Sequence, residues 1–369
     1  IYRVPAYTLE VGAEYEMTVS VSKKDVKYGA TGSTIVVVVP GDIQVEIAGG
    51  LERSLKPTGD TQRAILDASA SFDTDVKGLT GTDAGLSFSW SCAQILPTTV
   101  YDDCPGIVLN NKGSSVSIVD FKEVGTTSMI YLTVSDATNL RSVTKELVIK
   151  TLDAESPQVS TDVGTIDRFL VTNDVSFKGY IGIEADATST WTVNPTLDNF
   201  ESLLKAGTNR VSLALADGPL RTFDLDLYGS SLRPGKTYTF TLTCAYDSSD
   251  KIATTSVVVQ TNQPPQPGIV EATPAEGEEL RSEGWELRAS NWIDPERDGN
   301  LEYEFGSVDK GVDIALQDRS PRGSAIGLPL SAGQELNDFS RRVFFSIFDA
   351  LGASTTVYST VIVYPLGYV

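Results

Sequence analysis

The chain has 369 residues and a formal net charge of −20, because 49 Asp and Glu stand against 29 Lys and Arg, and it contains no histidine. Without histidine it cannot form a Ser-His-Asp or Cys-His couple, or a His-ligated zinc or iron site. The negative charge argues against binding to nucleic acid or to an anionic lipid surface. The longest aliphatic run, 35–39, is far shorter than the roughly 20 residues that cross a bilayer, so no membrane span is expected.

One strand pattern recurs four times: apolar residues alternate with polar ones, mostly Ser or Thr, and a turn and a second, β-branched strand follow. The first strands begin at Tyr15, Ile130, Tyr238 and Val343, and the second strands are predicted at 34–39, 143–149, 255–259 and 356–363. Alternation with period two is typical of a half-buried antiparallel strand. A unit of roughly 100 residues that ends in such a hairpin has the size of one immunoglobulin-like sandwich. The sequence therefore predicts an all-β chain of tandem antiparallel β-sandwiches in an extended array.

The domain boundaries are predicted where the hairpins end. Residues 1–41 are too few for a sandwich, so we expect them to be the C-terminal part of a preceding sandwich and the chain to be an internal segment or mature product of a longer protein. Complete sandwiches are predicted at 42–153, 154–262 and 263–369. The Pro-rich segment 262–268 should form a short and fairly stiff joint before the last of them.

Helix signals are scarce. The best is 198–206, with Asp198 as the N-cap and Gly207 as the stop. One or two turns of helix at this position would fit a loop between strands.

Acidic residues cluster in three predicted loops: Asp67, Asp73 and Asp75; Asp102 and Asp103; and Asp294, Glu296 and Asp298. Such carboxylates either bind calcium between strands or serve as solvated turn formers. Both interpretations stay open, and the run 294–299 is the most suggestive of calcium. None of the clusters has the spacing of an EF-hand loop.

The three cysteines have different predicted roles. Cys92 and Cys104 lie twelve positions apart across a loop that contains Pro and Asp, which favours a disulfide over two free thiols. Cys244 alternates in register with apolar residues of its strand and is predicted to pack in a core. The sequence has no usable N-glycosylation site, because Asn194-Pro195-Thr196 contains proline.

Two alternative sites involve other side chains. Trp191, Trp285 and Trp292 could form an aromatic platform for a sugar, although burial is the more ordinary fate of Trp292. A catalytic pair of carboxylates is conceivable among 49 acids, but nothing in the sequence places two of them on facing strand ends.

Two runs of residues carry a resemblance to a known family. The run 66–75 (LDASASFDTD), followed by 86–92 (LSFSWSC) with Trp90 as its expected core residue, resembles the PKD repeat and the receptor-for-egg-jelly (REJ) module of polycystin-1-like proteins. The last unit, with 262–268 (NQPPQPG), Trp292-Ile293-Asp294-Pro295 and 301–305 (LEYEF), is similar to the REJ module again. Two cysteines of that module fall on Val270 and Ala289 here, so apolar packing is expected in place of their disulfide.

The resemblance implies a non-catalytic, extracellular structural or adhesion segment of a cell-surface, flagellar or ciliary protein. It would act as a spacer and contact surface for other domains of the same chain and for extracellular proteins or glycans. No cofactor is expected, with calcium left open. The alternatives are a subunit of an extracellular filament such as a flagellar hair, which self-assembles through exposed strand edges, and a carbohydrate-binding region of a secreted enzyme.

Overall fold

The four predicted hairpins form the backbone of the fold. The computed structural model describes residues 4–5, 7–22, 29–57, 62–138, 140–279, 281–296 and 300–368, and its regular elements there are β-strands and short 3-10 turns. The hairpins are antiparallel pairs: β1 (Glu14–Ser22) with β2 (Gly29–Val37), β10 (Thr127–Ser135) with β11 (Ser142–Thr151), β20 (Thr237–Tyr246) with β21 (Ile252–Thr261), and β28 (Ser340–Phe348) with β29 (Ser354–Tyr364). The all-β prediction is therefore confirmed.

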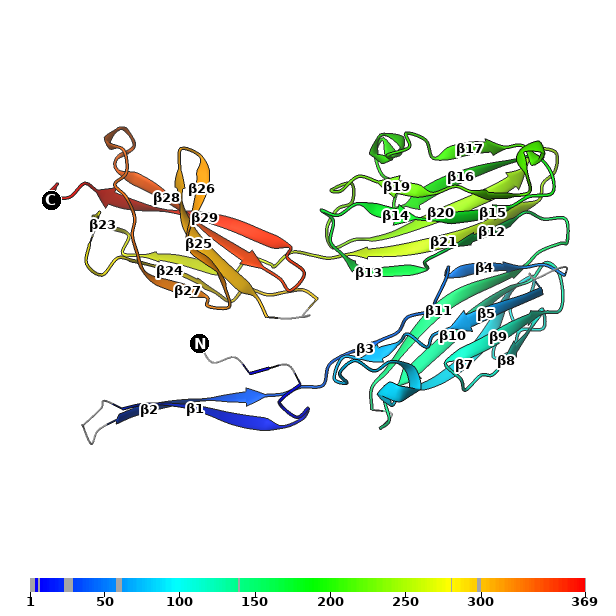
Figure 1. Ribbon diagram of the computed structural model, residues 1–369, viewed down its shortest axis with the longest axis horizontal. Coiled ribbons are helices and arrows are strands. Elements are labelled where there is room, and N and C mark those ends of the chain that lie inside the picture. The colour runs from blue at the N-terminus through cyan, green and yellow to red at the C-terminus, as the bar shows by residue number, and fades with distance from the viewer. Residues whose placement is uncertain are drawn as a thin grey trace.

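Three β-sandwiches follow the first hairpin along the chain (Figure 1). We call them the N-terminal sandwich (β3–β11), the middle sandwich (β12–β21) and the C-terminal sandwich (β22–β29). The other elements of the N-terminal sandwich are β3 (Ile43–Gln44), β4 (Glu52–Leu55), β5 (Arg63–Asp67), β6 (Phe72–Asp73), η2 (Gly81–Ala84), β7 (Ser87–Leu96), β8 (Ile107–Asn110) and β9 (Val116–Phe121).

The other elements of the middle sandwich are β12 (Gln158–Thr161), β13 (Thr165–Phe169), β14 (Val175–Phe177), β15 (Gly179–Gly182), β16 (Ala187–Asn194), η3 (Phe200–Leu203), β17 (Arg210–Leu213), η4 (Leu215–Asp217), β18 (Leu220–Thr222) and β19 (Leu225–Leu227). Those of the C-terminal sandwich are β22 (Ile269–Thr273), β23 (Glu276–Glu278), β24 (Trp285–Ser290), β25 (Glu302–Asp309), β26 (Val312–Ser320), β27 (Ser324–Leu328) and η5 (Glu335–Asn337).

Each sandwich places its terminal hairpin in the middle of its larger sheet. The strand orders are β4-β11-β10-β7, β13-β21-β20-β16-β17 and β23-β29-β28-β25-β26. In every case the first hairpin strand has an antiparallel neighbour and the second has a parallel one. The repeat seen in the sequence is thus a repeat of sheet topology.

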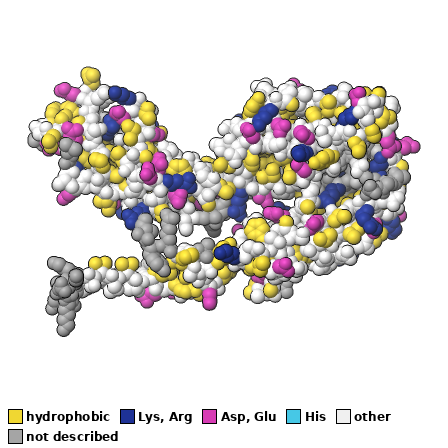
Figure 2. Space-filling view, viewed as in Figure 1, with side chains coloured by type: hydrophobic (Ala, Val, Ile, Leu, Met, Phe, Trp, Pro, Cys, Tyr) yellow, Lys and Arg dark blue, Asp and Glu magenta, His cyan; other side chains and the backbone are white. Residues whose placement is uncertain are grey.

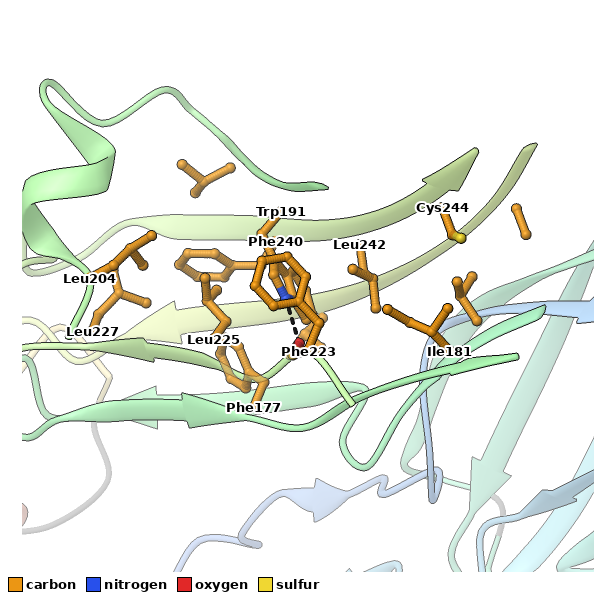
Figure 3. Close-up of a cluster of buried hydrophobic side chains, with 14 of the residues drawn as sticks. Phe177, Ile181, Trp191, Leu204, Phe223, Leu225, Leu227, Phe240, Leu242 and Cys244 are labelled. Atoms are coloured by element: carbon orange, nitrogen blue, oxygen red, sulfur yellow. Dashed lines mark hydrogen bonds between the residues drawn. The ribbon is translucent and has the colours of Figure 1, made fainter. Parts of the chain in front are cut away.

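Each sandwich buries its own hydrophobic core, built from the inward residues of the alternating strands. In the middle sandwich, Trp191 packs beside Phe177, which in turn contacts Phe240. The indole N–H of Trp191 donates to the carbonyl oxygen of Phe223 at 2.8 Å (Figure 3). Because the one polar atom of this large ring is satisfied inside the core, the ring can be fully buried.

The N-terminal and middle sandwiches lie side by side, whereas the C-terminal sandwich follows beyond the Pro-rich segment 262–268 (Figure 1). Strand β4 packs against β12 and β21 of the middle sandwich. The array is therefore extended at the second joint only, and it folds back at the first because the two sandwiches share a contact surface, described below.

The predicted helix at 198–206 is wrong in its extent. Asn199 has a left-handed backbone with a φ of 54°, and only the single 3-10 turn η3 follows it. Asp198 makes no capping hydrogen bond within this turn, and Leu204 is already extended and bridges Leu227. Burial of Leu204 in the core overrides the local helix propensity of the segment.

Candidate functional site

The disulfide joins two buried residues of the N-terminal sandwich. Cys92 on β7 is bonded to Cys104 in the following loop, with 6.0 Å between their Cα atoms, a normal separation for a disulfide. The bond ties this loop to the core. Cys244 on β20 is free and fully buried, and burial raises the pKa of its thiol, which keeps it protonated and unreactive.

The first acidic cluster does not form one group. Asp67 accepts a hydrogen bond from the backbone of Ser69 at 2.9 Å, and contacts with Ser69 lower the pKa of Asp67. Asp73 and Asp75 instead surround the guanidinium of Arg141, at 2.6 and 2.8 Å, and Asp136 joins them at 3.0 Å. A protein cation thus neutralises the carboxylates for which calcium was considered.

The second acidic pair belongs to the loop before Cys104. Asp102 has a left-handed φ of 62°, and a carboxylate oxygen of Asp103 accepts the N–H of Cys104 at 2.8 Å. Both positions serve the turn itself.

The Arg141 cluster also fixes the entry into the N-terminal sandwich. Arg141 donates to the carbonyl oxygen of Gly41 at 2.7 Å, and the N–H of Gly41 donates to both oxygens of Asp75 at 3.0 Å. Because Gly41 follows the first hairpin, this network anchors the segment that connects the hairpin to the rest of the chain.

A polar network joins the N-terminal and middle sandwiches. The ammonium of Lys56, a residue that is 6% exposed, donates to the carbonyl oxygen of Ser156 at 2.6 Å and lies 3.3 Å from a carboxylate oxygen of Glu184. Glu52 on β4 accepts hydrogen bonds from Lys150 at 2.8 Å and from Thr254 of β21. A buried ammonium with satisfied partners makes this contact specific.

Glycines bring the two backbones together at the same surface. A Cβ atom on Gly164 would lie 2.1 Å from the carbonyl oxygen of Gly49, and one on Gly50 would lie 2.8 Å from the hydroxyls of Thr161 and Thr255. Gly50 and Gly164 are not among the glycines with positive φ, so it is the approach of the neighbouring sandwich that excludes a side chain here.

The third acidic cluster lies at the joint between the middle and C-terminal sandwiches. One carboxylate oxygen of Glu296 accepts the N–H of Gln263 in the linker at 3.0 Å, and one of Asp294 accepts the N–H of Glu296 at 3.1 Å. The other oxygen of each carboxylate is buried without a hydrogen-bond partner. Burial, followed by the charge of Asp294, raises the pKa of Glu296. The third predicted ligand, Asp298, lies outside the described residues.

A pocket opens beside this joint, where all three sandwiches meet. Its volume is about 510 Å³, and Lys145, Asp167, Lys236 and Glu296 are among the residues that line it. Charges of both signs face the pocket. Elsewhere on the visible face, acidic side chains are scattered over the sandwiches rather than gathered in one patch (Figure 2).

The tryptophans lie in the cores. Trp90, Trp191, Trp285 and Trp292 are between 0 and 8% exposed, and three of their indole N–H groups donate to backbone carbonyl oxygens at 2.8–3.0 Å. This burial counts against a tryptophan platform for a sugar, because a stacking surface must be exposed.

Two further observations limit the kinds of site in the described part of the chain. It contains no group of three or more acidic or cysteine side chains placed to hold a metal ion. It also contains no helix long and apolar enough to cross a membrane.

Sequence reasoning missed Arg141 as the partner of the first cluster and missed the contact between two sandwiches. Only the Gly49-Gly50 pair before β4 gave a local signal, since adjacent glycines beside a strand indicate a close backbone approach.

The fold defines a protein of tandem immunoglobulin-like β-sandwiches, each with the same central hairpin. The family model of the REJ domain matches residues 2–367, and the chain therefore belongs to the REJ domain family. The resemblance seen in the sequence is confirmed over almost the whole chain.

Several solved structures of tandem domains are similar to the chain. A titin I-band fragment is 9% identical with a TM-score of 0.26, covering 88% of this chain and 99% of its own. The cadherin domains 1–4 of Drosophila N-cadherin are 12% identical with a TM-score of 0.29, covering 98% and 85%. Cadherin domains 1–4 of protocadherin gamma B7 are 13% identical with a TM-score of 0.26, covering 95% and 83%. At these TM-scores none of them superposes on the chain as a whole.

Proposed function

We propose that the chain is a non-catalytic, extracellular structural and adhesion segment of a larger polycystin/REJ-like protein, in which it spaces other domains and offers a surface to proteins or glycans. The observation that carries the proposal is the specific contact between the N-terminal and middle sandwiches. Sandwiches on flexible linkers would not need a buried Lys56 or glycines where they meet. A spacer of fixed geometry needs both, because its sandwiches must pack closely against each other. Membership of the REJ family supports the same function.

The proposed location is the cell surface, and more narrowly the surface of a flagellum or cilium. The Cys92–Cys104 disulfide supports an extracellular location, because such bonds persist in oxidising compartments. The test is to probe intact cells with an antibody against the chain, before and after external protease. We expect a surface signal that protease removes. A signal that appears only after permeabilisation would contradict the proposal, and a signal on the cell body alone would reject the flagellar location.

We also propose the boundaries 1–41, 42–153, 154–262 and 263–369, with 1–41 as the C-terminal part of a preceding sandwich. Tyr15, Met17, Val19 and Val21 share one face of the hairpin β1–β2, and the matching positions of β10, including Ile130 and Leu132, are fully buried. Val19 and Val21 are 68% and 66% exposed. Because the equivalent positions of β10 are buried, the exposure of this face supports the proposal that a second sheet belongs against it.

A filament subunit is the second candidate, and the same hairpin favours it. Within the described residues, β1 and β2 pair only with each other, and unpaired strand edges can accept strands of another copy. Replacing Val19 and Val21 by Lys distinguishes a filament subunit from a segment whose first hairpin completes a preceding sandwich. We expect the wild-type chain to stay monomeric in sedimentation once a complete preceding sandwich is fused before it. Polymers that persist with the fusion and vanish in the double variant would favour the filament instead.

A further inference from the structure

Two buried carboxylate oxygens at the joint between the middle and C-terminal sandwiches have no hydrogen-bond partner. Asp294 is 7% exposed, yet its Oδ2 atom has no hydrogen-bond partner, and neither does the buried Oε2 atom of Glu296. No ion pair reaches either carboxylate within the part of the chain that the structure describes. A buried carboxylate without a partner is costly, because it loses hydration and gains nothing in return.

The two carboxylates belong to one turn, and backbone hydrogen bonds hold one oxygen of each. The Oδ1 atom of Asp294 accepts the N–H of Glu296 at 3.1 Å, which holds the two side chains together at one turn. The Oε1 atom of Glu296 is held by the N–H of Gln263 at 3.0 Å. With one oxygen of each group fixed by backbone, the two remaining oxygens stay oriented and free to bind another atom.

The charge of Asp294 also acts on Glu296. Burial raises the pKa of Glu296, and the neighbouring Asp294 raises it further. Two buried carboxylates at one turn either share a proton or share a cation. Hard oxygen atoms are the ligands that Ca²⁺ prefers, and Ca²⁺ completes its shell of 6–8 oxygens from backbone carbonyls and water.

We propose that Asp294 and Glu296 bind Ca²⁺ through Oδ2 and Oε2 at the joint between the middle and C-terminal sandwiches. Because Glu296 also holds Gln263 of the linker, the bound ion fixes the linker against the C-terminal sandwich. The site lies on loops next to a Pro-rich segment, so binding stiffens the joint without changing either core. This proposal does not depend on the adhesive function proposed above.

The test uses the complete chain and measures Ca²⁺ binding directly by calorimetry, with Tb³⁺ luminescence excited through tryptophan as a second readout. Trp292 lies two residues before Asp294, which should permit energy transfer. We expect Glu296→Gln and Asp294→Asn to weaken binding by about tenfold or more, since each removes a charged ligand. Asp73→Asn is the matched control. It neutralises an acid that already contacts Arg141, and it should leave the affinity unchanged.

A stability measurement keeps the test independent of luminescence. Ca²⁺ that binds only the folded chain must raise the urea midpoint of the wild type, and it should raise the midpoint of Glu296→Gln by less. Limited proteolysis of 262–268 should slow in Ca²⁺ for the wild type only. Absence of Ca²⁺ binding by the wild type at millimolar concentration, or equal affinity in the wild type and Glu296→Gln, would overturn the proposal. The pair would then share a proton instead.

Discussion

At the scale of single residues, Arg141 ties together several separate segments of the N-terminal sandwich. Its guanidinium contacts Asp73, Asp75 and Asp136, and it reaches the backbone of Gly41, 100 positions earlier in the chain. A planar fork of donors can serve several carboxylates at once, which a Lys ammonium does less well. The three acids depend on this one cation.

Replacing Arg141 by Met should lower the free energy of unfolding by about 1–3 kcal/mol, because it leaves the buried Asp73 without its charged donor. Urea denaturation of the complete chain measures the loss. Arg63→Met is the control, since the Arg63–Asp120 pair is solvent-exposed and should contribute at most about 1 kcal/mol. Equal losses in the two variants would contradict the role assigned to Arg141.

The pKa of Asp136 makes a separate prediction about acid. Burial alone raises this pKa, but hydrogen bonds from Arg141 and Thr138 outweigh it and lower the pKa from its ordinary 3.8 to about 2. A carboxylate with a depressed pKa in the folded state stabilises the protein above its unfolded pKa and loses that effect as the pH falls toward 2. Thermal melting between pH 5 and pH 2 should therefore show a steeper loss in the wild type than in Asp136→Asn. Parallel curves would refute this assignment.

At the scale of elements, the register of β22 and β24 shows what replaces a disulfide of the REJ module. The two positions where that module has cysteines are Val270 and Ala289 in this chain. Val270 stands directly opposite Ala289 in the antiparallel pair. The two positions identified from the sequence alone are thus cross-strand neighbours, and Ala289 is buried. Apolar packing takes the place that a disulfide would have.

The double variant Val270→Cys with Ala289→Cys should therefore form a disulfide under oxidising conditions, because directly opposed residues bring their Cβ atoms to about 4.5–5.5 Å, close enough to bridge with a small adjustment. Mass spectrometry without reductant detects the loss of two hydrogens. Ala272→Cys with Ala289→Cys is the control. Ala272 pairs with Leu287 instead, so these cysteines are diagonal and should stay reduced. Free thiols in both variants would show that the register differs in solution.

At the scale of the whole molecule, the two main joints are built differently. The first is a broad contact in which β4 packs against strands of the middle sandwich, with Lys56 and Glu52 satisfied across it. The second is a Pro-rich linker with a few local hydrogen bonds, such as the one between Asn262 and Asp349 at 2.6 Å. The first joint is therefore expected to hold a fixed angle, and the second to respond to ligands.

Replacing Gly164 by Ala should open the first joint, because the new Cβ atom would lie 2.1 Å from the carbonyl oxygen of Gly49 and one backbone must move. Forced contacts of this kind typically cost about 1–3 kcal/mol. Small-angle scattering should report a larger radius of gyration, and hydrogen exchange should quicken in β4 and β12. Gly113→Ala is the control, since a Cβ atom there meets nothing within 4 Å. An unchanged radius in Gly164→Ala would mean that the joint tolerates the shift.

The sequence alone predicted the hairpins, because period-two alternation is a local property that each strand carries with it. The same holds for the core position of Trp90, which sits in an alternating run on β7. It also predicted the pairing of Cys92 with Cys104, which lie close along the chain. The predicted helix at 198–206 was wrong because Leu204 is buried and bridges Leu227. Such burial is a tertiary effect that local helix propensity does not include.

The tertiary structure decided how the sandwiches meet and which charges pair. The hydroxyl of Thr255 donates to the backbone of Glu52 across 203 positions of chain, and no local pattern marks such a pair. Arg141 and Asp73 likewise lie 68 positions apart in the chain and are brought together by the fold. The sequence by itself thus determined the all-β repeats and their membership of a family. Docking of the sandwiches, and the unpartnered carboxylates at the joint, arise from packing between distant segments.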